Sequence, residues 1–521
     1  MSETETLASG LGLSALTLAP RAEPLLIHLN HTLYHQKDPI TSVVMGMLLG
    51  GMLLAMAYSF GVLGLSLLPD GWVKRLSIAF SVFAATQLSC HVLARVLEGK
   101  YVPRILQASA YSVLTVLVII ALRSASRFYG VISRLRFLLT GGVIFALVVV
   151  GQLARAAAVS YQLSRQPPRL APAFTDPPKS PRVIWILFDE LSYKQVFDST
   201  PALGLHLPHF EALQHASVSF RNVTPAGYWT EEVVPSLFLG SVVKHVTAVT
   251  PRKVSIRIEG SAADVPFDPK ATIFGDLRAA GLNTAIVGWS NPYCDLLAPV
   301  LTTCVWQSDI PVLGRMTSEG VSGSQTALEN SLAILTRRLG ALRPWVNRGS
   351  GIMPDVVERK RSYDALISAA ICEIHDGTAA LLFIHLPVPH PPGFYSRRLQ
   401  AFSSSGTYLD NLALADQTLH VLLKAIAKSS TANATAVIVT SDHSWRIGLW
   451  KSAPQWSSEE ASASAEGFDP RIPLLVHFPG QSQELDIDRP FRAVRTRSLI
   501  ELMVGGTLSS PDSIEAWSKL P

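Results

Sequence analysis

The sequence predicts a chain in two parts: a helical transmembrane bundle, followed by an α/β domain with a mostly parallel central sheet. Two observations predict this. Long apolar segments are concentrated before residue 160, and from residue 182 onward short apolar runs alternate with amphipathic helical patterns. The run 183–190 is apolar, β-branched and aromatic until it ends in two acids. Such an uninterrupted run is typical of a strand that is buried on both faces of a parallel sheet.

The composition narrows the class of protein. The chain has 521 residues, 48% of them hydrophobic, and a formal net charge of +5. This length allows several domains. Because the positive charge is modest and spread along the chain, we expect no nucleic-acid partner.

The first part of the chain predicts a short tail and a four-span membrane domain. In residues 1–39 the apolar patches are too short and broken for a span. Residues 40–159 contain four apolar segments that each approach or exceed the roughly 20 residues needed to cross a bilayer. These segments are 40–68, 76–97, 105–122 and 137–159.

Basic residues in the short loops predict the orientation in the membrane. The loop between the third and fourth spans carries four arginines and no acid, so it should be cytoplasmic; they are Arg123, Arg127, Arg134 and Arg136. Lys74 and Arg75 then lie on the same side, and everything after residue 160 lies outside the cytoplasm. Other basic residues oppose this assignment: Lys100, Arg104, Arg155, Arg165 and Arg169.

Residues 160–181 are predicted to be a linker, because 166–181 are rich in proline and resist helix and strand. The second domain follows at 182–521. Its predicted strands are 183–190, 218–223, 284–287, 379–386, 435–440 and 472–478, and its predicted helices are 208–216, 272–280 and 411–427. The helical region 314–363 is interpreted as an insertion or a lid. Cys294 and Cys304 could form one disulfide bond if the domain is exported, or could be two unrelated thiols.

Three of the predicted strands end in acid–base or metal-binding residues. Asp189 and Glu190 follow one strand, His385 ends the second and precedes His390, and Asp442-His443 follow the third. Because the carboxyl ends of parallel strands lie along one edge of a sheet, we expect these side chains to converge.

These motifs, in this order, resemble the alkaline-phosphatase superfamily. They are Asp189 after a strand, Thr230 before Pro235-Ser-Leu, two histidines five positions apart, and Ser-Asp-His after a strand. The branch that they resemble most is the sulfatase-like membrane transferases, which include phosphoethanolamine transferases and lipoteichoic acid synthases. The resemblance covers residues 182–480 and implies an alkaline-phosphatase-like α/β sandwich and a hydrolase or transferase activity.

The resemblance also implies roles for individual residues. It makes Asp189, Thr230, Asp442 and His443 the ligands of one divalent metal, Zn²⁺ or Mn²⁺, with Glu190 as a substitute for Asp189. Thr230 is the implied nucleophile, and Thr224 is a second candidate whose spacing to Pro235 fits less well. The implied contacts to the phosphoryl group come from His385 and His390. A threonine hydroxyl activated by a metal would form a phospho-threonine enzyme.

The sequence departs from the family pattern in two places. No Cys/Ser-x-Pro-x-Arg motif surrounds Pro235, which argues against sulfate ester hydrolysis by the usual formylglycine route. Residues 444–457 contain no histidine, and there Arg446 or Lys451 could hold a phosphate oxygen or simply coat the surface.

We therefore expect a membrane enzyme that moves a phosphoryl-linked head group, of the phosphoethanolamine or phosphoglycerol type, from a lipid to an exported glycan or lipid. A bacterial-type plasma membrane, with the catalytic domain on its periplasmic or extracellular side, is the expected location. A hydrolase of phosphodiesters or sulfate esters is an alternative. An inactive protein that binds lipid or relays a signal is another, although the residues implied in catalysis are all present.

Overall fold

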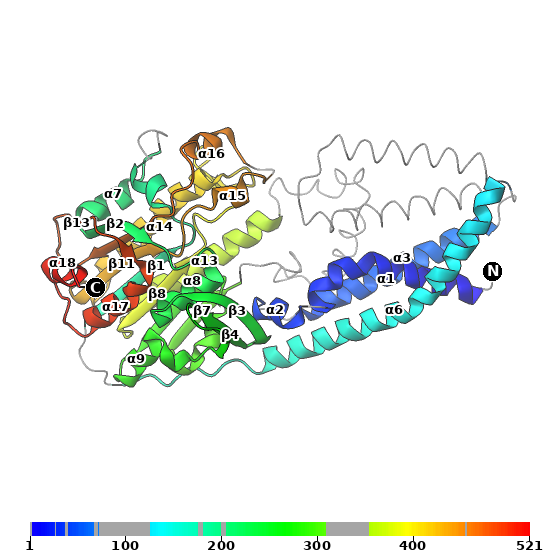
Figure 1. Cartoon of the computed structure of the whole chain (residues 1–521), viewed down its shortest axis with the longest axis horizontal. Coiled ribbons are helices and arrows are strands. Elements are labelled where there is room, and N and C mark those ends of the chain that lie inside the picture. Colours follow the sequence, from blue (N-terminus) through cyan, green and yellow to red (C-terminus); the bar gives the residue numbers. More distant parts are fainter. Residues whose placement is uncertain are drawn as a thin grey trace. The chain divides into compact units, whose positions relative to one another are not determined.

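The structure is a computed structural model of the whole chain, shown in Figure 1. It describes residues 3–26, 28–36, 40–66, 71, 125–175, 181–198, 205–308, 354–453 and 456–520. The described residues form two compact units. One contains residues up to Leu29 and from Ile40 to Ser164, and the other contains residues 30–36 and the residues from Arg165 onward.

The described part of the N-terminal unit is helical. Its helices are α1 (Glu3–Leu26), α3 (Thr41–Ser66) and α6 (Ala125–Arg165). Within α3 and α6, the segments Val44–Gly61 and Thr140–Arg165 are long and apolar enough to cross a membrane. They overlap the first and fourth predicted spans, whereas the second and third spans lie outside the described residues.

Two features of this unit were not anticipated from the sequence. The tail expected at 1–39 is largely helical, and α1 lies against α3, where the Ser14 hydroxyl donates to the carbonyl of Gly51 at 2.8 Å. The loop expected around Arg127, Arg134 and Arg136 belongs to α6, which also continues past residue 159 to Arg165. Arginine and leucine are good helix formers, and no proline interrupts residues 125–165, so the helix continues beyond the apolar segment.

The C-terminal unit is built around one large sheet. Its strands lie in the order β13 (Leu485–Ile487), β2 (Val218–Thr224), β12 (Ile472–His477), β11 (Thr435–Ser441), β1 (Arg182–Phe188), β8 (Leu381–Leu386), β6 (Thr284–Trp289) and β7 (Thr303–Gln307), and β14 (Phe491–Arg492) pairs with β2. The ladder from β11 through β1, β8 and β6 to β7 is parallel, while β12 runs antiparallel to both β11 and β2. The prediction of a mostly parallel central sheet is confirmed.

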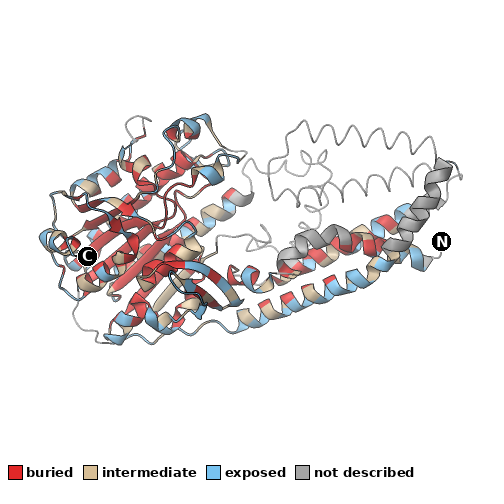
Figure 2. Cartoon of the chain, in the orientation of Figure 1, coloured by how far each residue is buried: buried red, intermediate tan, exposed pale blue. Residues whose placement is uncertain are grey.

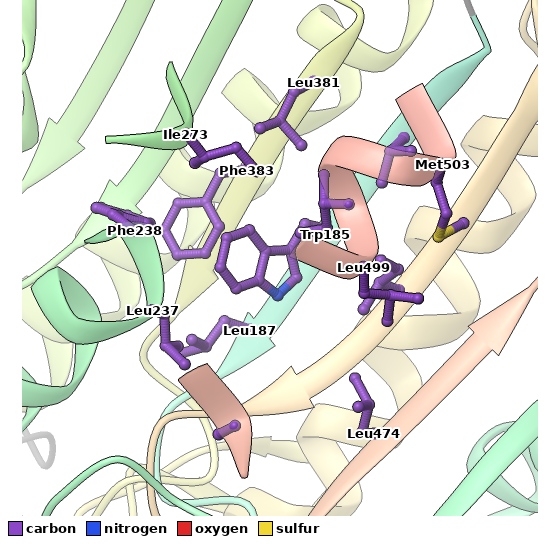
Figure 3. Close-up of a cluster of buried hydrophobic side chains, with 14 of the residues drawn as sticks. Trp185, Leu187, Leu237, Phe238, Ile273, Leu381, Phe383, Leu474, Leu499 and Met503 are labelled. Atoms are coloured by element: carbon purple, nitrogen blue, oxygen red, sulfur yellow. The ribbon is translucent and has the colours of Figure 1, made fainter. Parts of the chain in front are cut away.

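Strand β1 is buried on both faces, as its apolar run predicts. Val183, Trp185 and Leu187 belong to one hydrophobic core, and the alternate residues of the strand belong to the other. Figure 3 shows Trp185 and Leu187 among side chains from neighbouring elements, including Phe238, Phe383 and Leu499. This arrangement follows from the period of two in a strand, since successive side chains point to opposite faces.

Helices cover both faces of the sheet (Figure 1). The first core includes residues of α8 (Thr230–Leu239), α9 (Ile273–Ala279), α10 (Tyr293–Leu296), α17 (Thr496–Val504) and α18 (Pro511–Ser518). The second core includes residues of α7 (Pro208–His215), α13 (Pro354–Asp376), α14 (Tyr408–Lys428) and α16 (Ser458–Ala463). Figure 2 shows that the sheet is almost entirely buried between these layers.

The predicted strands and helices of this domain are present, with ends that differ by a few residues. The largest difference is that α14 begins at Tyr408 rather than at 411, and β1 ends at Phe188 rather than at 190. Of the predicted helical region 314–363, only residues from Pro354 onward are described, and these begin α13.

Several further elements were not predicted. A three-stranded sheet contains β3 (Val243–Thr250), β4 (Lys253–Ile258) and β5 (Val265–Pro266), and β9 (Tyr395–Ser396) pairs with β10 (Ala401–Phe402). A short helix, α2 (Leu29–Tyr34), belongs to this unit from Asn30 onward. The remaining short helical elements are π-helical Lys194–Asp198, α15 (Ile447–Trp450) and 3-10 turns at Pro269–Ala271, Ala298–Val300, Ala432–Ala434 and Ala493–Arg495.

The two cysteines whose state the sequence left open are bonded to each other. Cys294 lies in α10 and Cys304 in β7, and a disulfide joins them over a sequence separation of 10. The bond therefore ties the helix that follows β6 to the strand beside β6.

Candidate active site

The carboxyl ends of three neighbouring parallel strands form the centre of the site. Phe188, the last residue of β1, pairs with Ser441 of β11 on one side and with Leu386 of β8 on the other. This register places Asp189 and Asp442 directly after adjacent strands, with His385 near the end of β8. The predicted convergence at one edge of the sheet is confirmed.

Thr230 reaches this edge from the first turn of α8. Its Oγ1 lies 2.7 Å from Asp442 Oδ2, 3.2 Å from His443 Nε2 and 3.4 Å from Asp189 Oδ2. The predicted helix start beside Thr230 is therefore present, and the backbone N–H groups of such a start favour a bound anion. Thr224, the second candidate nucleophile, is exposed at the end of β2.

Asp442 and His443 form a buried, oppositely charged pair. Their side chains approach to 3.0 Å, measured from Asp442 Oδ2 to His443 Nε2, and both are at most 3% exposed. Burial alone would raise the pKa of Asp442, but the charge of His443 and a hydrogen bond from it outweigh this and hold that pKa well below its usual range. Burial likewise opposes the charge on His443, yet Asp442 raises the pKa of His443 to about 9.

Asp189 and Glu190 have different surroundings. Asp189 faces Thr230 and His385, and its Oδ2 lies 3.4 Å from His385 Nε2. Glu190 instead accepts hydrogen bonds from the backbone N–H of Arg446 at 2.7 Å and from Trp450 Nε1 at 2.8 Å. Since the backbone of Glu190 adopts a positive φ of 67°, the chain turns sharply here and sends the two carboxylates to different partners.

Arg446 is a buried partner of Glu190 and not a surface residue. Its guanidinium nitrogen Nη2 lies 3.2 Å from Glu190 Oε2 and 3.0 Å from His390 Nε2. The negative charge of Glu190 raises the pKa of Arg446 against the opposing effect of burial. Lys451, the other basic residue considered in this segment, is exposed.

Tyr293 is a site residue that the sequence reasoning missed. Its hydroxyl lies 2.6 Å from His385 Nδ1, and both side chains are buried. Burial raises the pKa of Tyr293 well above its ordinary value, so the phenol stays protonated and can donate to Nδ1. The hydrogen of a neutral His385 then lies on Nε2, which faces Asp189. The available signal was the position of Tyr293, a few residues after the carboxyl end of β6.

A buried carboxylate oxygen in this cluster indicates that the cluster can hold a metal. Asp189 Oδ1 has no hydrogen-bond partner among the described residues. Buried polar atoms rarely stay unsatisfied, and two carboxylates with an imidazole suit a divalent transition metal. Asp189, Asp442 and His443 each offer one ligand atom, and these three atoms lie within 4.8 Å of one another. The chemistry of these donors therefore fits the predicted metal.

The sequence profile of the sulfatase family matches residues 181–498, which is more than half of the chain. The chain belongs to the sulfatase family. It is therefore a hydrolase-type enzyme of the alkaline-phosphatase superfamily, as the motifs around Asp189 and Thr230 led us to expect. No curated protein matches the sequence.

Solved structures with a similar fold come from several organisms. A protein of the alkaline phosphatase superfamily from Vibrio parahaemolyticus is 17% identical, covers 64% of this chain and 68% of its own, and has a TM-score of 0.36. A phosphonate monoester hydrolase of Agrobacterium radiobacter is 13% identical, covers 62% and 74%, and has a TM-score of 0.38. Murine ectonucleotide pyrophosphatase/phosphodiesterase 5 is 11% identical, covers 63% and 95%, and has a TM-score of 0.35.

Proposed function

We propose that this sulfatase-family enzyme moves a phosphoryl-linked head group, of the phosphoethanolamine or phosphoglycerol type, from a membrane lipid to an exported glycan or lipid. The observation that carries the proposal is the position of the Thr230 hydroxyl, 2.7 Å from Asp442 and within 3.4 Å of Asp189. A hydroxyl held by two carboxylates and an imidazole at a helix start is arranged for attack on a phosphorus atom.

Asp189, Thr230, Asp442 and His443 would hold one divalent metal, zinc or manganese. When bound, such an ion supplies Lewis-acid stabilisation of the negative charge that develops on the nucleophile and on the phosphoryl oxygens. Because the pKa of Asp442 is held well below its usual range, its carboxylate stays ionised and orients the Thr230 hydroxyl.

In the first half-reaction Thr230 loses its proton to solvent, and a bond forms between its Oγ1 and phosphorus. The bond from phosphorus to the lipid alcohol breaks, and the departing oxygen receives a proton from a histidine. The product is a phospho-threonine. An acceptor alcohol then displaces Thr230 from phosphorus and loses its own proton, and the released Thr230 oxygen takes up a proton, which restores the hydroxyl.

The two histidines suit different tasks in this scheme. His385 is fully buried, and its Nε2–H can hold a non-bridging oxygen. His390 is 14% exposed in its side chain, so it can regain a proton from water after each turnover. To donate this proton His390 must be an imidazolium, whose Nε2 faces Glu190 Oε2 at 3.6 Å. The proton to be transferred is then on Nδ1, which has no hydrogen-bond partner among the described residues. We assign the leaving-group proton to His390.

The membrane and export parts of the proposal have separate support. The two long apolar segments in α3 and α6 fit a membrane anchor, which we propose has four spans between residues 40 and 159. The Cys294–Cys304 disulfide fits a catalytic domain on the periplasmic or extracellular side, because disulfides form and persist mainly in oxidising compartments. A lipid donor would explain why the catalytic domain is attached to a membrane anchor.

A phosphodiester hydrolase is the second candidate, favoured by the family to which the chain belongs. The same phospho-threonine would then be attacked by water. Sulfate ester hydrolysis has less support, because Thr230 cannot be converted into the formylglycine of the usual route. A protein without activity would also have this fold, but it would not form a phospho-threonine.

The test is a comparison of membrane lipids and surface glycans by mass spectrometry in cells with and without the gene, together with cells carrying Thr230→Ala or Thr230→Ser. We expect a modified acceptor and a dephosphorylated lipid only with wild type and, weakly, with Thr230→Ser. Release of the head group into solution, without a modified acceptor, would favour the hydrolase. Wild-type activity in Thr230→Ala would refute the assigned nucleophile.

A further inference from the structure

Beside the catalytic cluster, two histidines from the start of the chain meet a glutamate of α8. His31 lies in α2, and His35 follows its last helical residue. Glu231 is the residue after Thr230. His35 Nε2 lies 3.5 Å from Glu231 Oε2, and His31 Nε2 lies 3.9 Å from the same oxygen. The three side chains can each place one ligand atom within 4.8 Å of the other two.

The local structure explains why the two imidazoles share one face. Residues four positions apart on a helix are neighbours on its surface, and the ring centroids of His31 and His35 are 5.0 Å apart. An imidazole pair with this spacing is a common arrangement for binding a transition metal.

The segment that carries the histidines is anchored to the catalytic domain. Tyr34 is buried in a small hydrophobic cluster with residues of β3 and β4. Asn30 Nδ2 donates to the carbonyl of Val249 at 2.7 Å, and the Ser308 hydroxyl donates to the carbonyl of His35. The histidines are therefore held against α8 by contacts other than their own.

The distances fit three ligands of one ion better than a simple ion pair. With zinc–nitrogen and zinc–oxygen bonds of about 2.0–2.2 Å, the ligand atoms of a tetrahedral site lie roughly 3.3–3.6 Å apart. The observed 3.5 and 3.9 Å are close to this, whereas good charge-assisted hydrogen bonds have lengths of about 2.7–2.9 Å. His35 is buried, and its Nδ1 has no hydrogen-bond partner among the described residues. Hydrogen bonds at Nδ1 therefore do not stabilise the buried imidazole.

We propose that His31, His35 and Glu231 bind a second divalent transition metal of the zinc class, separate from the metal of the catalytic cluster. Two imidazoles and one carboxylate leave a fourth position open, for water or another ligand. The ion joins the segment before the first apolar helix to the first turn of α8. Because Glu231 is bonded directly to Thr230 in the chain, this metal also restrains the backbone that carries the proposed nucleophile.

The site can be tested by measuring zinc per chain on the full-length protein, purified in detergent, loaded with zinc and desalted. The informative background is Asp442→Asn/His443→Ala, which removes ligands of the catalytic cluster. We expect this variant to retain about one zinc per chain, and to lose it when His31→Ala/His35→Ala is added. Glu231→Gln, which preserves the shape of the side chain, should lower zinc occupancy by more than half. His28→Ala removes an exposed histidine of the same segment and should leave the zinc content unchanged.

Cobalt provides a second readout that does not depend on activity. Cobalt loaded into the Asp442→Asn/His443→Ala background should give visible d–d absorption that disappears with His31→Ala/His35→Ala. A thermal unfolding curve for each variant distinguishes loss of the ion from loss of the fold. If the double alanine variant is unstable, the zinc content of Glu231→Gln tests the site instead.

The outcomes separate this inference from the proposed function. The second site would be overturned if the Asp442→Asn/His443→Ala variant held the same amount of zinc with and without the His31 and His35 substitutions. It would also be overturned if the Asp442→Asn/His443→Ala variant held no zinc. If only the catalytic cluster fails to bind metal, wild type and Asp442→Asn/His443→Ala will hold equal amounts, and His31→Ala/His35→Ala will hold none.

Discussion

Thr230 Oγ1 and Asp442 Oδ2 lie 2.7 Å apart although 212 positions separate the two residues in the chain. The carboxylate comes from the end of β11 in the sheet, and the hydroxyl comes from the first turn of α8. Their contact joins a rigid sheet edge to a helix start, where the electrostatic field favours an anion. This contact identifies Thr230 as the candidate nucleophile. The residues around it can each be tested by a separate substitution.

The different surroundings of Asp189 and Glu190 predict different effects on metal binding. Asp189→Asn should weaken metal affinity at the catalytic cluster by more than about tenfold, because it removes a charged ligand. Glu190→Gln should change this affinity much less, since Glu190 is engaged by Arg446 and Trp450. Competition with a chelator in the His31→Ala/His35→Ala background measures both. A larger loss in Glu190→Gln would reassign the ligand.

Metal affinity at the same cluster should depend on pH. Asp442 raises the pKa of His443 to about 9 in the metal-free protein, so His443 is protonated at neutral pH. A histidine that binds a metal must be neutral, and binding therefore releases this proton. We expect the apparent affinity, measured by the same competition, to rise roughly tenfold per pH unit from 7 to 9 and to level off above 9. A profile that is flat over this range would contradict the raised pKa; His215→Ala, an exposed histidine, should keep the wild-type slope.

The buried pair of Glu190 and Arg446 should matter to stability. Glu190→Gln leaves the guanidinium of Arg446 buried without its charged partner, which costs on the order of 3 kcal/mol. The thermal midpoint should therefore fall, and adding Arg446→Met should recover part of the loss. Glu484→Gln breaks the more exposed pair with His215 and should shift the midpoint little. Equal midpoints for Glu190→Gln and Glu484→Gln would show that the buried pair contributes nothing.

Tyr293 should act by positioning His385. Tyr293→Phe removes the hydrogen bond to Nδ1 and frees the imidazole to change tautomer, so we expect kcat to fall about tenfold with KM almost unchanged. Tyr395→Phe is the matched control, since the hydroxyl of Tyr395 bonds to Gln400 and Gln417 rather than to a proposed catalytic group. An increase in KM alone would instead assign Tyr293 to substrate binding.

The proposed topology predicts the compartment of the C-terminus. A phosphatase reporter fused after Pro521 should be active, and a reporter that is fluorescent only in the cytoplasm should be dark. Cys294 and Cys304 should resist alkylation until a reductant is added, because they are disulfide-bonded. Cytoplasmic fluorescence together with alkylated cysteines would place the catalytic domain on the other side of the membrane.

Local sequence patterns were sufficient to predict the central sheet of the catalytic domain. The uninterrupted apolar run of β1 predicted a strand buried on both faces, and the chain places it at the centre of the sheet. Since parallel strands end at one edge of a sheet, the same pattern predicted that Asp189, His385 and Asp442 lie close together. Helix α1 and the sheet of β3, β4 and β5 were not predicted, because their apolar periodicity is weak; buried and exposed residues do not alternate regularly along β3.

Pairings between distant residues were decided only by the tertiary structure. The sequence by itself determined that acids and histidines follow buried strands, but not that Glu190 would turn towards Arg446 while Asp189 faces Thr230. It left the state of Cys294 and Cys304 open, and it contained no sign that His31 and His35 would meet Glu231. The physical reason is that strand and helix patterns reflect contacts along a few neighbouring residues. The partner of a buried charge depends instead on how segments hundreds of residues apart are packed.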